Sequence, residues 1–429
     1  MSIEVGQDLT LLVEKPAAGG RMIARHDGQV VLVAGAIPGE RVRARVERVE
    51  KQLAFAMAVA IVEASADRRE AAADPLCGGV VYSHIRYDRQ LALKADLIAD
   101  AFARLGRLPL DAPVPVMRSP ERGYRMRARL HVRAGRIGFF REGSHDVCDA
   151  GPSALLTDAS ISAVASAVAS LAADGATPVT LQLTENMPGS ERAIHADVAF
   201  GARISEPVLA RAASAAGLTG CTARTAGGVL MSAGEPTVGD SYAELTAGRA
   251  AAGALRRHPE SFFQANRHLL PALVTHVLDA VPGDGPVLDL YAGVGLFALS
   301  LAATGRSAVT AVEGDTASAR DLAANAASLS GAVRVVVGGV EDHLSRSRER
   351  PAVILVDPPR TGISKAAMES IARHGAARVV YVSCDAPTMA RDARRLVDAG
   401  YQIASLRGFD LFPNTPHVET VGIFERSGR

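Results

Sequence analysis

The chain has 429 residues, of which 48% are hydrophobic and 22% are charged, and its formal net charge is +1. This length exceeds what one core usually holds, so two or three domains are expected, and the composition excludes a disordered chain. A net charge near zero gives no sign that the surface as a whole binds nucleic acid. The first residues lack the order of a signal peptide, no apolar run is long enough to cross a bilayer, and the four cysteines show no disulfide framework. We therefore expect a cytoplasmic protein.

The first segment, residues 1–65, is predicted to be a small β domain. Strand-like stretches such as LTLLVEK, GQVVLVAGA, ERVRARVERVE and AFAMAVAIVEA are separated by turn signals. In the third stretch, arginines alternate with small apolar residues, which is typical of a half-buried strand with a basic outer face. That face is either solvated or in contact with RNA. A charged, alanine-rich connector over residues 67–74 follows.

The second segment, residues 75–256, is predicted to be a mixed α+β domain. Residues 90–106 have helical periodicity, with Gly106 placed as a helix stop. The stretch GYRMRARLHVR places Arg125, Arg127 and Arg129 on one side of a strand. Like charges on one face repel each other, and RNA would relieve that repulsion. We expect these arginines to contact RNA; the alternative is a solvated edge face.

The third segment, residues 257–429, alternates apolar strands with helices. PVLDLYAG, SAVTAVEGD, AVILVDPPR and ARVVYVSCD are strand-like, and the stretches between them have helical patterns. Apolar strands alternating with helices are typical of a parallel sheet that is covered on both faces. The segment is therefore predicted to be a doubly wound α/β domain.

The stretch LDLYAGVGLFAL is a candidate nucleotide-binding turn. Asp289 stands at a strand end, and Gly293 and Gly295 lie in the turn before a helix, where glycine allows close approach of a ligand. Glu313 ends the next strand, where a carboxylate suits two ribose hydroxyls. The third glycine of the dinucleotide spacing and the lysine of a phosphate loop are both missing. This pattern favours S-adenosylmethionine over NAD; the alternative is an ordinary turn with a helix cap.

Two further strand ends carry candidate chemistry. Asp357 begins the proline-locked loop DPPR, which belongs at the open, ligand-binding edge of the sheet. Arg360 stands where amino-group methyltransferases with a related loop have an aromatic residue, which disfavours transfer to an exocyclic nitrogen. Cys384 lies between a strand and a helix start at Asp385. We expect exposure and the positive helix end to favour its thiolate, the nucleophilic form; the alternative is a small buried thiol.

These motifs together resemble the bacterial and archaeal family of RNA uracil-5 methyltransferases. The matching stretches, in the family's order, are FFQAN (262–266), LDLYAGVG, VEGD, LVDPPRTG, YVSCDAPTMARD and PHVETV (416–421). GYRMRARL and GFFREGSHDV resemble the family's central domain, and the first segment resembles a TRAM domain, a small RNA-binding β-barrel. The resemblance implies a Rossmann-like methyltransferase domain preceded by a barrel and a central α+β domain.

The resemblance also implies roles for single residues. It implies transfer of a methyl group from S-adenosylmethionine to carbon 5 of an RNA uridine, by way of a covalent bond to carbon 6. Cys384 matches the nucleophile and Glu419 the proton acceptor, whereas His417 is expected to be structural. Phe262 or Phe263 either holds the flipped base or packs in the core. The positions that match the cofactor site are Gln264, Tyr291, Glu313 and Asp357.

The sequence departs from the family in two places. Many members carry a [4Fe–4S] cluster on four cysteines, but here Cys77 and Cys148 match two ligands and Val80 replaces a third, with no cysteine upstream. Two of four ligands should not hold the cluster, so we predict that no metal is bound. The other departure is Leu296, where many members have an asparagine that touches the cofactor.

Two other functions are weighed against methylation of uracil. One is an RNA-binding or RNA-folding protein with a relict methyltransferase domain, against which the intact Cys384, Asp357 and Glu419 argue. The other is an RNA cytosine-5 methyltransferase, a family with Thr-Cys and Pro-Cys contexts, whereas this chain has Ser-Cys. The TRAM-like segment favours 23S rRNA over tRNA as the substrate. We expect RNA to be the partner, no membrane contact, and a monomer.

Overall fold

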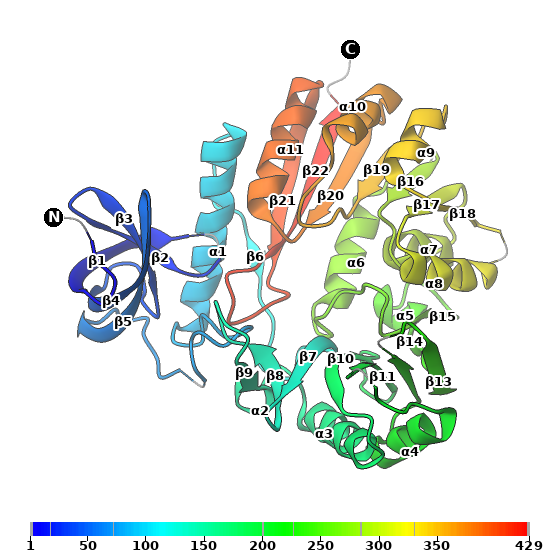
Figure 1. Cartoon of the computed structure of the whole chain (residues 1–429). Coiled ribbons are helices and arrows are strands. Elements are labelled where there is room, and N and C mark those ends of the chain that lie inside the picture. The colour runs from blue at the N-terminus through cyan, green and yellow to red at the C-terminus, as the bar shows by residue number, and fades with distance from the viewer. Residues whose placement is uncertain are drawn as a thin grey trace.

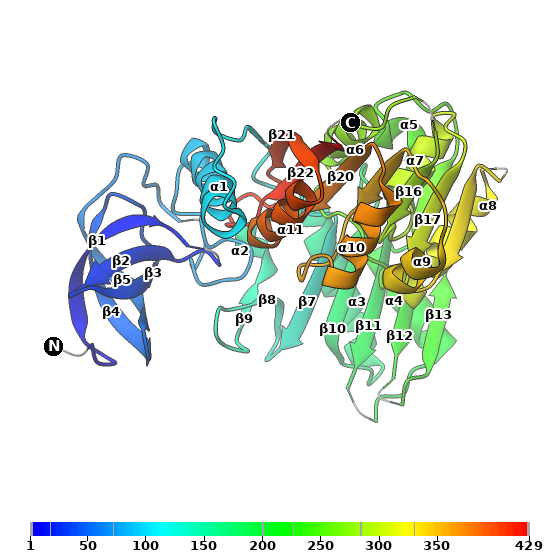
Figure 2. The ribbon, with the colours of Figure 1, turned by 90° about the horizontal axis from the view of Figure 1, so that it is seen from above.

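The computed structural model describes residues 3–17, 19–71, 73–199, 201–225, 227–283, 285–329 and 331–426. The extreme ends of the first and last expected domains, and Ala72 in the expected connector, lie outside these residues. A closed barrel, a seven-stranded sheet and an eight-stranded sheet form the molecule. In Figures 1 and 2 the barrel stands at one end, and helix α1 lies between it and the two larger sheets.

The N-terminal barrel has five strands in the order β1-β2-β3-β5-β4. Side chains of β1 and β4 alternate between exposed and buried, as a half-buried strand requires. Strand β2 was not expected, because it is short and follows directly on a glycine-rich turn, yet its Met22 and Ala24 are buried in the barrel core. The strands are β1 (Asp8–Pro16), β2 (Met22–His26), β3 (Gln29–Ala34), β4 (Arg41–Glu50) and β5 (Leu53–Glu63).

The helix expected over residues 90–106 is divided in two. Helix α1 spans Tyr87–Ala101, and a π-helix spans Phe102–Gly106. A Cβ atom on Gly106 would lie 2.8 Å from the carbonyl oxygen of Ala390, so glycine is needed where this segment meets the C-terminal domain. Leu93 packs in the barrel core and Phe102 in the core of the C-terminal domain. Helix α1 therefore joins the barrel to that domain.

The central sheet has the order β13-β12-β11-β10-β7-β8-β9 and carries helices α3 and α4. Its strands are β7 (Arg127–Arg133), β8 (Arg136–Phe140), β9 (Val147–Asp149), β10 (Pro178–Glu185), β11 (Arg192–Val198), β12 (Gly220–Arg224) and β13 (Leu230–Gly234). Its helices are α2 (Ala150–Ser153), α3 (Asp158–Ala173) and α4 (Glu206–Ala216). A hairpin of β14 (Val238–Ser241) and β15 (Ala254–Arg257), with α5 (Tyr242–Leu245), leads to the last domain.

The C-terminal sheet has the order β18-β17-β16-β19-β20-β22-β21-β6. Strands β18 to β20 are parallel and β22 is antiparallel to its neighbours, as the doubly wound α/β expectation requires. The strands are β16 (Val287–Leu290), β17 (Val309–Glu313), β18 (Val333–Val337), β19 (Val353–Val356), β20 (Arg378–Ser383), β21 (Tyr401–Phe409) and β22 (Glu419–Arg426). The helices are α6 (Leu270–Asp279), α7 (Leu296–Ala303), α8 (Thr316–Ala327), α9 (Val340–Arg346), α10 (Lys365–His374) and α11 (Ala386–Asp398).

One edge of this sheet is closed by a strand from far upstream. Strand β6 (Val116–Met117) precedes the central sheet in the chain but pairs in parallel with the end of β21. In the described parts of the chain, every helix is too short or too polar to span a membrane.

Candidate active site

The carboxyl ends of the parallel strands form one edge of the C-terminal sheet, and the predicted cofactor residues gather there. Asp289, near the end of β16, is fully buried. Its Oδ2 accepts a hydrogen bond from the backbone N–H of Ala298 at 3.0 Å, while its Oδ1 has no partner among the described residues. Burial raises the pKa of Asp289 well above its ordinary value. An unpaired buried oxygen of this kind indicates a place for a ligand or a bound water.

The turn after β16 has the backbone geometry that the two glycines suggested. Tyr291 has a φ of 61°, and Gly293 and Gly295 have φ values of 58° and 97°. A Cβ atom on Gly295 would lie 2.4 Å from Leu299 Cδ1, so a larger residue does not fit there. The backbone N–H of Gly293 donates to Glu313 Oε2 at 2.7 Å, which fixes the turn to the tip of β17. The turn and Glu313 therefore form one rigid unit.

Asp357 and Gln264 lie on the other side of this turn. Gln264 Nε2 donates to Asp357 Oδ2 at 3.3 Å. Burial and the nearby charge of Glu313 raise the pKa of Asp357 to about 7. One cavity is lined by the predicted residues Gln264, Tyr291, Gly293 and Asp357, and also by Phe262, Phe263 and Leu296. The structure therefore brings the predicted cofactor residues together, with Leu296 in the wall at the position where many members of the resembled family have an asparagine.

The candidate nucleophile lies between β20 and α11, as its sequence context predicted. Asp385 caps α11, and its side chain accepts a hydrogen bond from the N–H of Thr388 at 2.8 Å. Burial and the charge of Glu419 raise the pKa of the Cys384 thiol to about 11, although Arg360 opposes this shift. The expectation that exposure and the helix end favour the thiolate is therefore wrong for the free protein. The residue is only partly exposed, and Asp385 already occupies the positive end of the helix.

Strand register sets Glu419 beside Cys384. Ser383 at the end of β20 is paired with Thr420 of antiparallel β22, so Cys384, which follows Ser383, and Glu419, which precedes Thr420, are brought to the same end of the two strands, and the charge of Glu419 acts on the Cys384 thiol. The Glu419 side chain is 2% exposed, and its Oε1 lacks a hydrogen-bond partner within the described ranges. Burial, followed by the charge of Asp357, raises the pKa of Glu419 well above its ordinary value.

Arg360 is a member of the site that the sequence reasoning missed. Its guanidinium lowers the pKa of both Cys384 and Glu419, against the effect of burial. The Arg360 carbonyl accepts a hydrogen bond from Thr388 Oγ1 at 3.1 Å, which ties the proline loop to α11. Its position three residues after Asp357 was the only signal in the sequence. That position was interpreted only as disfavouring methyl transfer to an exocyclic nitrogen. His417 lies close by, and burial together with Arg360 lowers its pKa to about 4.

The two phenylalanines before Gln264 have different environments. Phe263 is 3% exposed and packs in the core, with the guanidinium of Arg257 3.8 Å from its ring centre. Phe262 is 56% exposed and lines the cofactor cavity, with the guanidinium of Arg127 5.6 Å from its ring centre. Phe262 is therefore free to contact a ligand, whereas Phe263 is a core residue.

The three predicted RNA-contact arginines do not form one open stripe. Arg125 precedes β7, donates to the carbonyl of Arg127 at 3.0 Å and lies 5.2 Å from the ring centre of Phe139. Burial lowers the pKa of both Arg125 and Arg127. Arg129 is exposed. Arg127 thus faces the catalytic domain, and Arg129 faces solvent.

The two cysteines that match cluster ligands lie next to each other. The pKa of Cys77 is raised by burial and then by a hydrogen bond with Cys148. Val80 is buried in the same apolar core, at 1% exposure. Among the described residues, no group of three or more histidine, cysteine or acidic side chains is arranged to hold a metal ion. The absence of a cluster stays a prediction.

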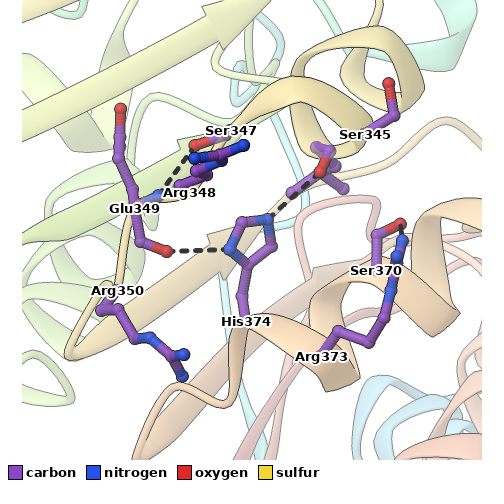
Figure 3. A pocket seen from close by; sticks show the side chains of 9 residues that line it. Ser345, Ser347, Arg348, Glu349, Arg350, Ser370, Arg373 and His374 are labelled. Carbon is purple, nitrogen blue, oxygen red and sulfur yellow. Dashed lines mark hydrogen bonds between the residues drawn. The ribbon is translucent and has the colours of Figure 1, made fainter.

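A cavity of about 290 Å³ lies at the opposite end of the C-terminal sheet, before the start of β19 (Figure 3). His374 stands at its centre, with Nδ1 2.9 Å from the carbonyl oxygen of Glu349 and Nε2 3.3 Å from that of Leu344. None of the predicted site residues lines this cavity. The candidate chemistry is therefore confined to the carboxyl edge.

Comparisons with known proteins agree with this arrangement. A TRAM domain model matches residues 3–59, and a tRNA (Uracil-5-)-methyltransferase model matches residues 344–427. A 23S rRNA (uracil(1939)-C(5))-methyltransferase RlmD from Pseudomonas putida is 33% identical, over 99% of this chain and 95% of the relative. The relative of the same name from Methylococcus capsulatus is 32% identical, over 96% of both chains. An uncharacterized RNA methyltransferase from Streptomyces coelicolor is 32% identical, over 99% of this chain and 94% of the relative.

A solved structure confirms the expected fold. The tRNA (uracil-54, C5)-methyltransferase of Pyrococcus abyssi, in complex with S-adenosyl-L-homocysteine, superimposes with a TM-score of 0.78 at 23% identity, over 96% of this chain and 99% of that one. The identity of 33% with the Pseudomonas relative extends over nearly the whole of both chains. The chain therefore belongs to the family of RNA uracil-5 methyltransferases.

Proposed function

We propose that the protein transfers a methyl group from S-adenosylmethionine to carbon 5 of a uridine in RNA, with Cys384 as the nucleophile and Glu419 as the proton acceptor. The observation that carries this proposal is the β20–β22 register, which brings the thiol and the carboxyl to the same end of the two strands, at the edge that holds the glycine turn. Family membership supports the same reaction.

The residues at this edge fit the cofactor. Within the described part of the chain, Asp289 Oδ1 is buried without a partner and the space next to Gly293 is open, and the glycine turn lets backbone approach a ligand closely. When bound, S-adenosylmethionine supplies an electrophilic methyl group on a sulfonium. We propose that it is held by Gln264, Tyr291, Gly293, Gly295, Glu313 and Asp357.

The first chemical step makes uracil carbon 5 nucleophilic. The Cys384 thiol gives its proton to water, and the sulfur forms a bond to carbon 6. The electrons of the C5=C6 double bond form a C4=C5 double bond, and those of the C4=O bond move to oxygen 4, which gives an enolate. Burial and Glu419 oppose formation of the thiolate, whereas the positive charge of Arg360 stabilises it. Carbon 5 then forms its bond to the methyl carbon. The bond between that methyl carbon and the sulfonium sulfur of S-adenosylmethionine breaks at the same time.

The second step restores the aromatic ring. The carboxylate of Glu419 removes the proton from carbon 5, the electrons of that C–H bond re-form the C5=C6 double bond, and the thiolate of Cys384 leaves. Because the pKa of Glu419 is raised, its carboxyl group must lose a proton before it acts as the base. The target base must also leave its stack to reach this partly buried site.

We propose 23S rRNA as the substrate in preference to tRNA, because the barrel matches a TRAM domain and relatives along the whole chain bear the name of a 23S rRNA enzyme. Arg125, Arg127 and Arg129 would contribute to RNA binding. We further propose that the protein works in the cytoplasm, as a monomer.

Mass-spectrometric mapping of 5-methyluridine tests this function. Ribosomal RNA and tRNA from a strain that lacks the gene should each be compared with the parent strain, and the purified protein should restore the missing methyl group when S-adenosylmethionine is added. We expect one uridine of 23S rRNA to lose its methyl group in the deletion strain. A loss in tRNA would reassign the substrate, and unchanged RNA with no methylation in vitro would favour a relict methyltransferase domain.

A further inference from the structure

A second cavity borders the candidate nucleophile on the barrel side. It has a volume of about 290 Å³ and lies where the β1–β2 hairpin of the barrel meets α1, the π-helix and the loops that carry Cys384 and His417. Four separate parts of the chain build its walls, which include Ile23, Leu97, Leu105, Cys384, Pro387 and His417.

This cavity is distinct from the place proposed for the target uracil. Of the groups at the catalytic edge, Cys384 lines it, but Gln264, Asp357 and Glu419 do not. A uracil bonded to Cys384 has to face Glu419 and the cofactor cavity, whose lining residues are all different. The barrel-side cavity therefore borders Cys384 on a side that neither Glu419 nor the cavity beside the glycine turn lines.

The walls of this cavity suit an uncharged, flat group. Ile23, Leu97 and Pro387 are apolar, and Leu105 on the π-helix is 48% exposed. Burial lowers the pKa of His417 to about 4, so its ring is neutral near pH 7.

Both acidic groups at the cavity are already paired. Asp100 accepts hydrogen bonds from Lys15 at 2.8 Å and from Arg104 at 3.1 Å, and Asp385 accepts one from the N–H of Thr388 at 2.8 Å. The basic side chain that lines the cavity, Arg104, is paired with Asp100, which disfavours a phosphate, whereas a nucleobase finds apolar surface and the ring of His417. The chemistry of the walls thus favours a base over the sugar–phosphate backbone.

The volume is consistent with a single base. Small-molecule cavities hold roughly 300–1,000 Å³, so about 290 Å³ accommodates a compact ligand and excludes a helix or a duplex. Bases that are read individually in RNA are unpaired and splayed out of their stack, as they are near a flipped nucleotide.

We infer that this cavity receives an unpaired nucleobase next to the target uridine, so that the barrel hairpin helps to select the RNA. The inference rests on the proposed function, because it requires an RNA whose uridine reaches Cys384. It also gives the barrel a role in recognising one base beside the catalytic cysteine.

The test combines two changes. A tryptophan side chain fills the cavity of the protein, and an abasic nucleotide removes the neighbouring base from the RNA. Ile23→Trp places an indole in the cavity from the barrel wall, and Leu97→Trp does so from the helix wall if the first variant fails to fold. Val62→Trp is the matched control, because Val62 is exposed on the same barrel and does not line the cavity. Each full-length protein is assayed with S-adenosylmethionine and an RNA fragment containing the mapped uridine, either intact or abasic at one neighbouring nucleotide in turn.

For one neighbouring position, we expect the wild-type protein and Val62→Trp to lose roughly tenfold in kcat/KM when the base is missing. Ile23→Trp or Leu97→Trp should show a similar loss on intact RNA and no further loss on that abasic RNA, with unchanged binding of S-adenosylmethionine. Wild-type rates for the folded tryptophan variants, or equal effects of the missing base in all proteins, would overturn the inference. If the wild-type protein methylates no uridine, the proposed function fails, and the wild-type arm shows this independently of the variants.

Discussion

Cys384, Glu419 and Asp357 all have raised pKa values in the free protein, and Arg360 is the positive charge that opposes the shift at two of them. A raised pKa opposes formation of the thiolate at Cys384 and of the carboxylate at Glu419. In the proposed mechanism, both groups have to lose a proton before they act. This arrangement leads to two predictions about single residues.

The first prediction separates the nucleophile from the base. Cys384→Ala should abolish methylation and still bind S-adenosylmethionine, because the thiol is needed only for addition to carbon 6. In Glu419→Gln, Cys384 should still add to carbon 6 and the methyl group should still be transferred, but no base then removes the carbon 5 proton. Loss of a general base typically lowers the rate about 10²–10⁴-fold. Enzyme and RNA should remain joined on a denaturing gel, in a band that carries the methyl label.

The double variant of Cys384→Ala with Glu419→Gln is the control, and the joined band should be missing from it. Turnover of Glu419→Gln at the wild-type rate without a joined band would show that Glu419 is not the base. The carboxylate of Asp357 or a bound water would then take that role.

The second prediction concerns pH. The proposed reaction needs the thiolate of Cys384 and the carboxylate of Glu419, and protons leave both groups as the pH rises, so kcat/KM should increase with pH toward the Cys384 pKa of about 11. Arg360→Met removes the charge that lowers the pKa of Cys384, so kcat/KM of this variant should rise at a higher pH than kcat/KM of the wild-type protein. Arg360→Lys keeps the charge and should lie closer to the wild-type profile. Parallel profiles for wild type and Arg360→Met would show that Arg360 does not tune the thiol.

At the scale of elements, helix α1 holds the loop that leads to Glu419. Lys94 of α1 and Asp410 are both fully buried and form an ion pair, and Lys94 also donates to the carbonyl of Phe412 at 3.0 Å. Gln90 of the same helix accepts a hydrogen bond from the N–H of Asn414 at 2.9 Å. The loop before β22 is therefore fastened to a helix from a distant part of the sequence.

The third prediction follows from this buried pair. Lys94→Met should leave Asp410 buried without its counter-charge, which typically costs roughly 3–5 kcal/mol. Urea unfolding monitored by circular dichroism should show the loss. The double variant that adds Asp410→Asn should recover part of the stability, because it removes the unpaired charge. Equal stability of Lys94→Met and the wild type would show that the pair is not needed.

The fourth prediction concerns strand β7 and the residue before it. Replacing Arg125, Arg127 and Arg129 together with alanine should weaken RNA binding while affinity for S-adenosylmethionine is unchanged. Each lost phosphate contact should reduce the log–log salt slope by about 0.7–0.9. Arg129→Ala alone should account for a slope change, since it is the exposed member, and exposed Arg346→Ala on α9 is the control. An unchanged slope in the triple variant would place the RNA surface elsewhere.

Much of the site was predictable from the sequence, because parallel strands bring their carboxyl ends to one edge. Asp289, Glu313, Asp357 and Cys384 each follow or end an apolar run, so their meeting required only the fold class. The raised pKa of the Cys384 thiol was not predictable, since it depends on burial and on Glu419 from a distant strand.

Two elements were missed for a related reason. Strand β2 is short and follows a glycine-rich turn, so its pattern is weak without the barrel around it. Strand β6 consists of two residues, and nothing local predicts that it pairs with β21. Both depend on contacts between segments that are distant in the sequence, and periodicity does not record such contacts.

At the scale of the whole molecule, the fifth prediction is that the protein binds no metal cluster. Cys77 follows the linker from the barrel, and Cys148 lies on β9 of the central sheet, with Val80 in the apolar core beside them. Protein purified anaerobically should be colourless and nearly free of iron, because two thiols lack the remaining ligands of a cluster. Iron analysis and the visible absorption spectrum measure this. Stoichiometric iron with a charge-transfer band would contradict it.

The pairing of β6 with β21 has a consequence for how the protein is made. The ribosome releases β6 before the central sheet, but its partner strand emerges only after the central sheet and the parallel strands of the C-terminal sheet, so this edge stays open until all of those strands have been made. Pairings between such distant segments close a long loop and are slow to form. A truncated protein that starts after the central sheet would keep β21 as a bare edge, which is a template for aggregation. The three domains are thus expected to mature as one chain and not as separable modules.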